Sequence, residues 1–189
     1  MAVGVVVVPG YGDSEPAHWQ SFACRRHPQW RRVRQADWER PEVEPWVVAL
    51  DAEVRALDGP LVLVAHSLGC ITVVEWAARR RADVRGALLV APADTDELPF
   101  FADVPLAPLP FPSIVVASRN DPYVRFERAQ AFAAAWGSRL VDAGAAGHLN
   151  AAAGYGDWPR IGFWLGPWLG TTPGAGAAAG RGVAAVLPG

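Results

Sequence analysis

The sequence predicts an α/β fold in which a mostly parallel sheet of about six strands carries helices on both faces. Residues 5–8, 61–65 and 86–91 are continuous apolar runs, as in strands buried on both sides. Longer segments with apolar residues at helical spacing lie between such runs, which is typical of parallel strands joined by helices. The chain has 189 residues, of which 51% are hydrophobic, enough for one domain with a sizeable core.

The first half of the chain predicts three strands and two helices, in the order strand 5–8, helix opening at 15–20, strand 30–36, helix 44–57 and strand 61–65. Pro9-Gly10 closes the first strand, and Pro16 suits the first turn of the first helix. The second helix has its apolar residues at helical spacing and ends before Gly59.

The second half continues the alternation with helix 68–81, strand 86–91, strand 113–118, helix 123–136, strand 139–142 and helix 158–169. The helix 68–81 is apolar on nearly all sides through Ala78, so we expect it to lie against the sheet. We assign residues 1–170 to the domain. The Gly/Ala-rich tail, 171–189, is expected to be disordered.

Composition excludes several classes of protein. The net charge of −2 argues against nucleic acid or an anionic membrane as the main partner. Cys24 and Cys70 give neither a disulfide framework nor metal-ligand spacing. The N-terminal apolar run ends at Pro9 and has no basic segment before it, so no signal peptide or membrane span is predicted and the cytoplasm is the expected location.

The segment 61–71 has the pattern of a buried strand, a sharp bend at Ser67 and a helix that starts at once. Such a bend needs small residues two before and two after the serine, and Ala65 and Gly69 meet that need. The pattern resembles the nucleophile elbow of α/β-hydrolases, in which the bend exposes the serine hydroxyl above the sheet. The bend also directs the Leu68 amide toward negative charge on a bound carbonyl. An ordinary strand-to-helix turn is the alternative interpretation.

The loop 9–14 follows the first strand and contains two glycines, which permit a tight turn and a close approach to a ligand. In α/β-hydrolases this loop supplies the second amide of the oxyanion hole, the pair of N–H groups that bind the charged oxygen of the intermediate. The Tyr11 amide is our candidate. A plain glycine-rich turn is the alternative.

A serine hydroxyl needs a base to become nucleophilic at neutral pH, and the base needs a group that orients it. His148 is the candidate base, since the fold delivers its base from the loop after the last strand. His66 adjoins the serine with its side chain directed away, and His18 and His27 precede the elbow in the chain.

Asp121 is the candidate acid, because it follows strand 113–118 at the position where the fold supplies the third triad residue. Asp-Pro is also a common turn device. Asp94 and Asp142 are the rivals. Asp142 belongs to the last predicted strand and lies too early in the chain to reach under His148.

Several segments together resemble the retinoblastoma-binding protein nine and YdeN-like serine hydrolases: Pro9-Gly10-Tyr11-Gly12, His18-Trp19-Gln20, Asp37-Trp38-Glu39-Arg40-Pro41, Ala65-His66-Ser67-Leu68-Gly69, Arg119-Asn120-Asp121-Pro122 and Gly147-His148-Leu149-Asn150. The resemblance covers residues 3–169 and implies a Ser67-Asp121-His148 triad in a compact α/β-hydrolase fold without a separate cap domain. It also implies that Trp19 and Trp38 lie near the mouth of the site, although core packing explains each of them equally well.

The proline-rich segment 92–112 leaves the carboxyl end of a strand, which is the ligand side of such a sheet. We expect it to form one wall of the substrate pocket, with Phe100 and Phe101 as lining residues.

We therefore predict a serine hydrolase that cleaves small acyl esters, or amides, without a metal or organic cofactor. An acyltransferase or thioesterase built on the same triad is the first alternative. A non-enzymatic binding module with this fold is the second.

Overall fold

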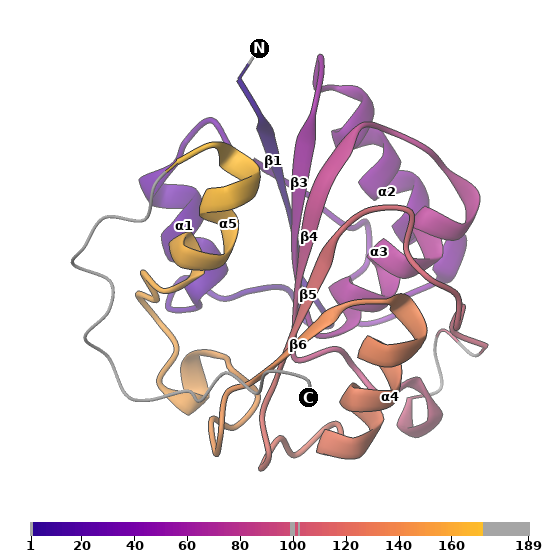
Figure 1. Cartoon of the computed structure of the whole chain (residues 1–189), viewed down its shortest axis with the longest axis vertical. Coiled ribbons are helices and arrows are strands. Elements are labelled where there is room, and N and C mark those ends of the chain that lie inside the picture. Colours follow the sequence, from indigo (N-terminus) through magenta and orange to yellow (C-terminus); the bar gives the residue numbers. More distant parts are fainter. Residues whose placement is uncertain (1, 99–100, 102, 172–189) are drawn as a thin grey trace.

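The computed structural model, which describes residues 2–98, 101 and 103–171, has a six-stranded sheet in the order β2-β1-β3-β4-β5-β6 (Figure 1). The strands are β1 (Gly4–Val8), β2 (Arg31–Arg32), β3 (Leu61–His66), β4 (Val84–Val90), β5 (Ser113–Ala117) and β6 (Arg139–Asp142). Every pairing is parallel. The predicted α/β-hydrolase fold is confirmed. Phe100 and the tail beyond Thr171 lie outside the described residues.

Helices cover both faces of the sheet, as predicted. Helices α1 (Trp19–Arg26) and α5 (Ile161–Leu169) lie on one face, and α2 (Val43–Arg55), α3 (Leu68–Arg79) and α4 (Phe126–Trp136) lie on the other (Figure 1). Two short 3₁₀ helices, η1 (Thr95–Glu97) and η2 (Ala151–Ala153), complete the described elements.

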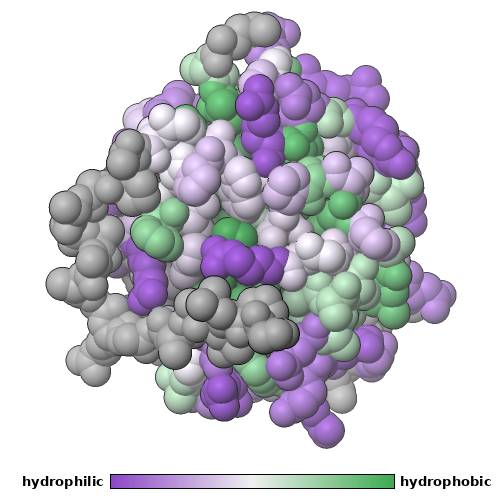
Figure 2. All heavy atoms as spheres, in the orientation of Figure 1, coloured by the Kyte–Doolittle hydropathy of each residue, from purple (hydrophilic) through white to green (hydrophobic). Residues whose placement is uncertain are grey.

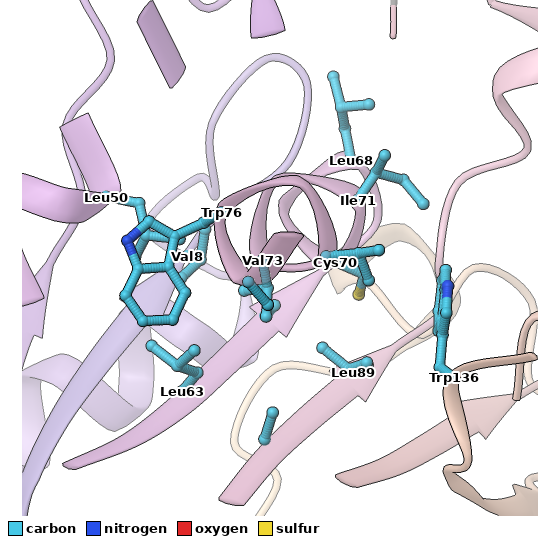
Figure 3. Close-up of a cluster of buried hydrophobic side chains, with 14 of the residues drawn as sticks. Val8, Leu50, Leu63, Leu68, Cys70, Ile71, Val73, Trp76, Leu89 and Trp136 are labelled. Atoms are coloured by element: carbon cyan, nitrogen blue, oxygen red, sulfur yellow. The ribbon is translucent and has the colours of Figure 1, made fainter. Parts of the chain in front are cut away.

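Alternation along the strands divides the core into two halves. Val5 and Val7 of β1 pack with α1 and α5, whereas Val6 and Val8 pack with α2, α3 and α4. Figure 3 shows the second half, where Trp76, Val73 and Cys70 of α3 are directed toward strands β3 and β4. Full burial of a large apolar side chain contributes about 1.5–3 kcal/mol to stability, so the packing of α3 on the central strands stabilises the fold strongly.

Several element boundaries differ from the prediction; helix α1 begins at Trp19 with His18 as its N-cap, so Pro16 precedes the helix instead of lying in its first turn. The strand expected at 30–36 is only Arg31–Arg32, because Val33 alone in that run is fully buried beside β1. Helix α4 begins at Phe126 because the Asp121 carboxylate accepts the Tyr123 N–H and makes 121–124 a turn. Helix α5 begins at Ile161, after a turn in which Trp158 O accepts the Ile161 N–H.

The loops that follow β1, β3, β4, β5 and β6 meet at one edge of the sheet, because parallel strands all end on the same side. Figure 2 shows hydrophilic and hydrophobic residues interspersed over the face in view. Tyr11 and Tyr123, two of the large hydrophobic residues that are exposed, belong to these loops. None of the described helices is long and apolar enough to cross a membrane.

Candidate active site

The bend at Ser67 is set by close packing between the elbow and β1. Ser67 has φ 54° and ψ −124°, a conformation that costs energy for any residue with a side chain. A Cβ atom added to Gly69 would lie 2.2 Å from the Val8 carbonyl oxygen, so only glycine permits this contact. Ser67 N–H donates to Val90 O, which ties the bend to β4 as well. The serine is thereby held at the end of the sheet.

The loop after β1 lies directly against the elbow. A Cβ atom on Gly10 would lie 2.8 Å from Ser67 Cβ and 3.1 Å from the Leu68 nitrogen. Leu68 is the first residue of α3, where backbone N–H groups have no partner inside the helix. Arg32 holds the same loop from outside, with its guanidinium 2.5 Å from Asp13 Oδ1 and 2.8 Å from Ser14 O. Tyr11 and Leu68 thus border the space above Ser67.

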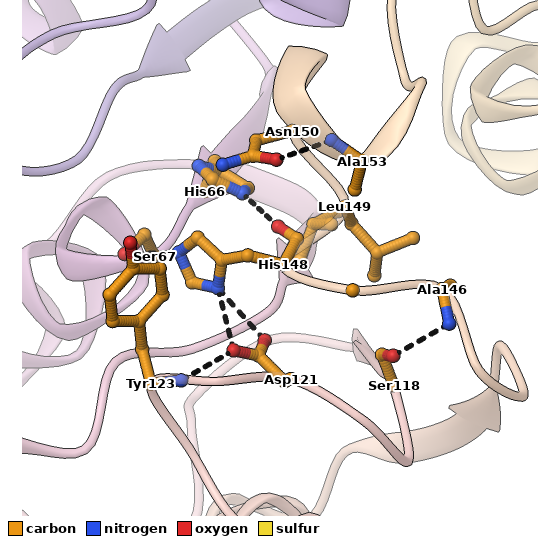
Figure 4. Close-up of polar contacts among 12 residues, drawn as sticks. His66, Ser67, Ser118, Asp121, Tyr123, Ala146, His148, Leu149, Asn150 and Ala153 are labelled. Carbon is orange, nitrogen blue, oxygen red and sulfur yellow. Dashed lines mark hydrogen bonds and ion pairs between the residues drawn. The ribbon is translucent and has the colours of Figure 1, made fainter.

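Ser67, His148 and Asp121 form a continuous chain of contacts; Figure 4 shows the part between His148 and Asp121. His148 Nε2 lies 3.0 Å from Ser67 Oγ, and His148 Nδ1 lies 2.8 Å from Asp121 Oδ2. The Asp121 side chain is 0% exposed, and its other oxygen accepts the Tyr123 N–H. Because a carboxylate only accepts, Nδ1 carries the proton and Nε2 is left to accept one from the serine.

The base loop, residues 144–150, follows β6 and presents His148. Ala146 N–H donates to Ser118 Oγ, and Gly147 N–H donates to Asn120 Oδ1, so the chain beyond β5 orients the loop beyond β6. Gly147 has φ 58°, and a Cβ atom there would lie 2.8 Å from Ala153 Cβ. The glycine before the candidate base is therefore required by both conformation and space.

The rival acids have other partners. Asp94 accepts from the Asp96 amide and forms an ion pair with Arg128. Asp142 is bound by Arg119, whose hydrogen bond lowers the pKa of that carboxyl. Neither contacts His148, and Asp121 alone among the three lies against the imidazole.

Two further histidines sit beside His148, a grouping that sequence reasoning missed. The His66 ring lies 4.8 Å from the His148 ring and 4.7 Å from the His18 ring, centroid to centroid. Burial lowers the pKa of His18 to about 4 and the pKa of His66 well below its usual range, so both rings are neutral at pH 7. The available signal was that His66 adjoins Ser67 in sequence.

These residues open into a cleft of about 750 Å³. Its lining comes from five loops: Tyr11, Gly12, Asp13, Glu15, His18, His66, Ser67, Leu68, Ala93, Asp94, Leu98, Asp121, Pro122, Tyr123, Val124, Arg125, His148 and Asn150. From the segment 92–112, the part near η1 lines the cleft as expected. Farther along, Leu109 N–H donates to Trp136 O, and this part packs against α4.

The residues that line the cleft do not include Trp19, Trp38 or Phe101, the three described residues of the predicted aromatic lining. Trp19 is 1% exposed, because it packs between β1 and α5 with its Nε1–H bonded to Leu149 O. Phe101 is 3% exposed and packs edge-on against Trp46. Trp38 also packs against Trp46 and borders a separate hollow beside Arg32. Burial in the core explains the positions of Trp19 and Phe101, whereas Trp38 is only partly buried and its carbonyl oxygen accepts the Gly12 N–H of the loop after β1.

Comparison with known proteins identifies the family of the chain. The family model for serine hydrolases matches residues 5–166. The chain belongs to the serine hydrolase family. The hydrolase is 37% identical to a YdeN-like hydrolase from Pectobacterium atrosepticum, with a TM-score of 0.84 over 89% of this chain and 91% of that one. The predicted family resemblance is thus confirmed.

More distant structures share the fold of the hydrolase. The ydeN gene product of B. subtilis has 22% identity and a TM-score of 0.73, over 89% of this chain and 100% of that one. The esterase RhEst1 from Rhodococcus has 14% identity and a TM-score of 0.66, over 89% and 90% of the two chains. No curated protein matches the hydrolase.

Proposed function

We propose that this serine hydrolase cleaves small acyl esters through a Ser67-His148-Asp121 triad and an acyl-enzyme. The contact of 3.0 Å between Ser67 Oγ and His148 Nε2, backed by the buried Asp121 carboxylate, is the observation that carries the proposal. A serine with its base already in hydrogen-bond reach is the arrangement that nucleophilic acyl transfer requires.

In the proposed reaction, Ser67 Oγ attacks the acyl carbon while its proton moves to His148 Nε2. The tetrahedral intermediate collapses, the bond to the leaving oxygen breaks, and His148 returns the proton to that oxygen. Water then repeats the sequence on the acyl-enzyme and releases the acid. Asp121 stabilises the imidazolium formed in each half and keeps the ring in the required tautomer.

The Leu68 and Tyr11 amides are the proposed oxyanion donors. Leu68 contributes the N–H of the first residue of α3, and the close approach at Gly10 brings the Tyr11 loop to the same side of Ser67. Loss of one such donor costs on the order of 3 kcal/mol, or about a hundredfold in rate.

The shape of the cleft supports small substrates. The described part of the chain has no helical domain over Ser67; η1 is the only helix there between β4 and β5. Tyr123 is 61% exposed and its ring lies 4.7 Å from the His148 ring, where it would contact one side of a bound ester. An open cleft with mixed polar and apolar walls suits short acyl groups better than long lipid chains.

Covalent labelling tests the proposal. A fluorophosphonate probe is expected to modify Ser67 in the wild type, as read by mass spectrometry. Ser67→Ala should remain unlabelled, and His148→Ala should react at least about a hundredfold more slowly. Ser138→Ala is the control, because that hydroxyl bonds Ser113 at the start of β5, far from the cleft. A folded wild-type protein that does not react at Ser67 would refute the triad.

Substrate assays then separate the remaining alternatives. p-Nitrophenyl acetate, butyrate and decanoate should be hydrolysed with efficiency falling as the chain grows, and the matching anilide should react more slowly than the ester. Added alcohol or thiol that diverts most of the acyl group would instead identify an acyltransferase.

A further inference from the structure

Four side chains from other parts of the chain bind the base loop through its backbone. Ser118 and Asn120 accept its N–H groups, while Trp19 and His66 bind its carbonyl oxygens, in the pairs Ser118–Ala146, Asn120–Gly147, Trp19–Leu149 and His66–His148. All four lengths lie between 2.7 and 2.9 Å. The loop is therefore held by remote residues and has little regular structure of its own.

The contact made by His66 differs from the others because it joins the base loop to the elbow itself. His66 Nε2 lies 2.9 Å from the carbonyl oxygen of His148 (Figure 4). A carbonyl oxygen only accepts, so Nε2 carries the hydrogen and donates it. His66 directly precedes Ser67 in the chain. One hydrogen bond thus links His66, the neighbour of the candidate nucleophile, to His148, the candidate base.

The loop conformation requires such support. Gly147 has φ 58° and Leu149 has φ 50°, so the residues on both sides of His148 lie in the left-handed region. A leucine there is strained and adopts this conformation only when its surroundings impose it. Leu149 is fully buried, and the carbonyl before it is the one that His66 binds.

The His66 ring is itself held in place. It is 5% exposed, and it lies edge-on between the His18 and His148 rings at centroid distances of 4.7 and 4.8 Å. Such packing leaves little room for the ring to rotate away from the carbonyl that it binds.

We propose that His66 is a positioning residue that sets the reach of His148 Nε2 toward Ser67 Oγ by donating Nε2–H to the His148 carbonyl. The inference rests on the proposed triad and adds a residue to it. Because a displacement of about 1 Å at a reacting group costs about a hundredfold in rate, a bond that fixes the base loop against the elbow acts on kcat. The effect on KM is expected to be smaller, because His66 is one of many residues that line the cleft and the others, Ser67 and Tyr123 among them, are not substituted.

Two matched variants test the donor. His66→Gln places an amide nitrogen the same number of bonds from Cα as Nε2, whereas His66→Met has similar length and no donor. With p-nitrophenyl acetate, His66→Met should lose about tenfold to a hundredfold in kcat with KM changed by less than about threefold. His66→Gln should recover most of that loss. The rate of fluorophosphonate labelling at Ser67 should follow kcat in both variants.

A second measurement reads the loop without using activity. Amide hydrogen exchange in residues 144–150 should be faster in His66→Met than in wild type, and His66→Gln should restore the protection. If His66→Met does not fold, His66→Asn replaces it, because its amide is one carbon too short to reach the carbonyl.

Wild-type kcat and exchange in His66→Met would overturn the proposal. Equal losses in the Met and Gln variants would also overturn it, because they would show that the ring volume matters and the donor does not. A wild-type enzyme unreactive at Ser67 would instead refute the triad, and the exchange comparison would still decide whether His66 holds the loop.

Discussion

The elbow and the base loop lie opposite each other at the same edge of the sheet, but different forces shape them. The elbow is shaped by steric packing against β1 and the loop after it: glycine at 69 and at 10 allows the two segments to approach closely. The base loop is shaped by hydrogen bonds from residues distant in the sequence, such as Ser118 and Trp19, which lie 28 and 130 positions from their partners.

The two regions therefore differ in how their residues are held in position. A steric constraint leaves a sequence pattern that can be recognised, because only certain residue sizes fit. A constraint made of remote hydrogen bonds leaves no local pattern, since the loop residues themselves need only supply backbone groups. The structure places the candidate nucleophile and the candidate base within hydrogen-bond distance, but the local sequence pattern around the candidate nucleophile is the easier one to recognise.

The largest loss of activity is expected where the base depends on a remote partner. Asp121→Asn keeps an oxygen for the Tyr123 N–H but offers an amide N–H to His148 Nδ1, which moves the imidazole proton to Nε2. In that tautomer the ring cannot accept the serine proton, so kcat should fall about 10³–10⁴-fold with the fold retained.

Asp142→Asn is the matched control for this experiment, because it loses only the ion pair with exposed Arg119 and keeps an acceptor for the Gly144 N–H. It should retain activity close to that of the wild type in a steady-state ester assay. Near-normal kcat in Asp121→Asn would assign the acid role to another carboxylate.

A smaller but still large loss of activity is expected when the packing of the elbow against β1 is disturbed. Gly69→Ala places a Cβ atom 2.2 Å from Val8 O, so the elbow and β1 must separate. The free energy of unfolding should fall by about 1–3 kcal/mol, and phosphonate labelling should slow by about a hundredfold. Urea unfolding and labelling kinetics measure the two effects.

Gly162→Ala in α5 is its counterpart, because a Cβ atom there meets nothing within 4 Å. Alanine favours the helix over glycine, so this variant should be about 1 kcal/mol more stable than wild type and equally active. Similar behaviour of the two alanine variants would show that packing does not set the elbow.

The smallest effect on activity concerns the histidines between the two regions. Burial lowers the pKa of His18 to about 4 in the folded protein, below its ordinary value of 6.5, which applies in the unfolded chain. At pH values between about 4 and 6.5, the unfolded chain therefore binds a proton at His18 that the folded chain does not bind. The resulting stability is fully present above pH 6.5 and lost as pH falls toward 4, by up to about 3 kcal/mol.

His18→Asn removes this titration and keeps an acceptor for the Gln20 N–H at the start of α1. Urea unfolding between pH 4.5 and 7.5 should show a weaker pH dependence for His18→Asn than for wild type, with activity at pH 7.5 little changed. An unchanged slope would show that His18 does not titrate on unfolding.

The fold was predictable because its signals are periodic and local. The conformation can be predicted from the local sequence for the valine run of β1, the apolar helix α3 and the bend at Ser67. The order of elbow, Asp121 and His148 follows from the fold, so the sequence also identified the residues that the structure brings within hydrogen-bond distance.

The roles of the aromatic residues were not predictable, because burial depends on what lies across the sheet. Trp19 occupies a space between β1 and α5, and α5 comes more than a hundred residues later in the chain. The bond from Trp19 to Leu149 O gives that tryptophan a part in holding the base loop, which no local pattern encodes.

The distance along the chain between nucleophile and base has a consequence for synthesis. Ser67 and His148 are 81 residues apart, which a ribosome adding about 5–20 residues per second takes about 4–16 s to cover. Throughout that interval Ser67 is an ordinary alcohol with no base beside it. Under the proposed mechanism, the growing chain therefore cannot carry out acyl transfer at Ser67 until β6 and the loop that follows it have been made and have joined the sheet.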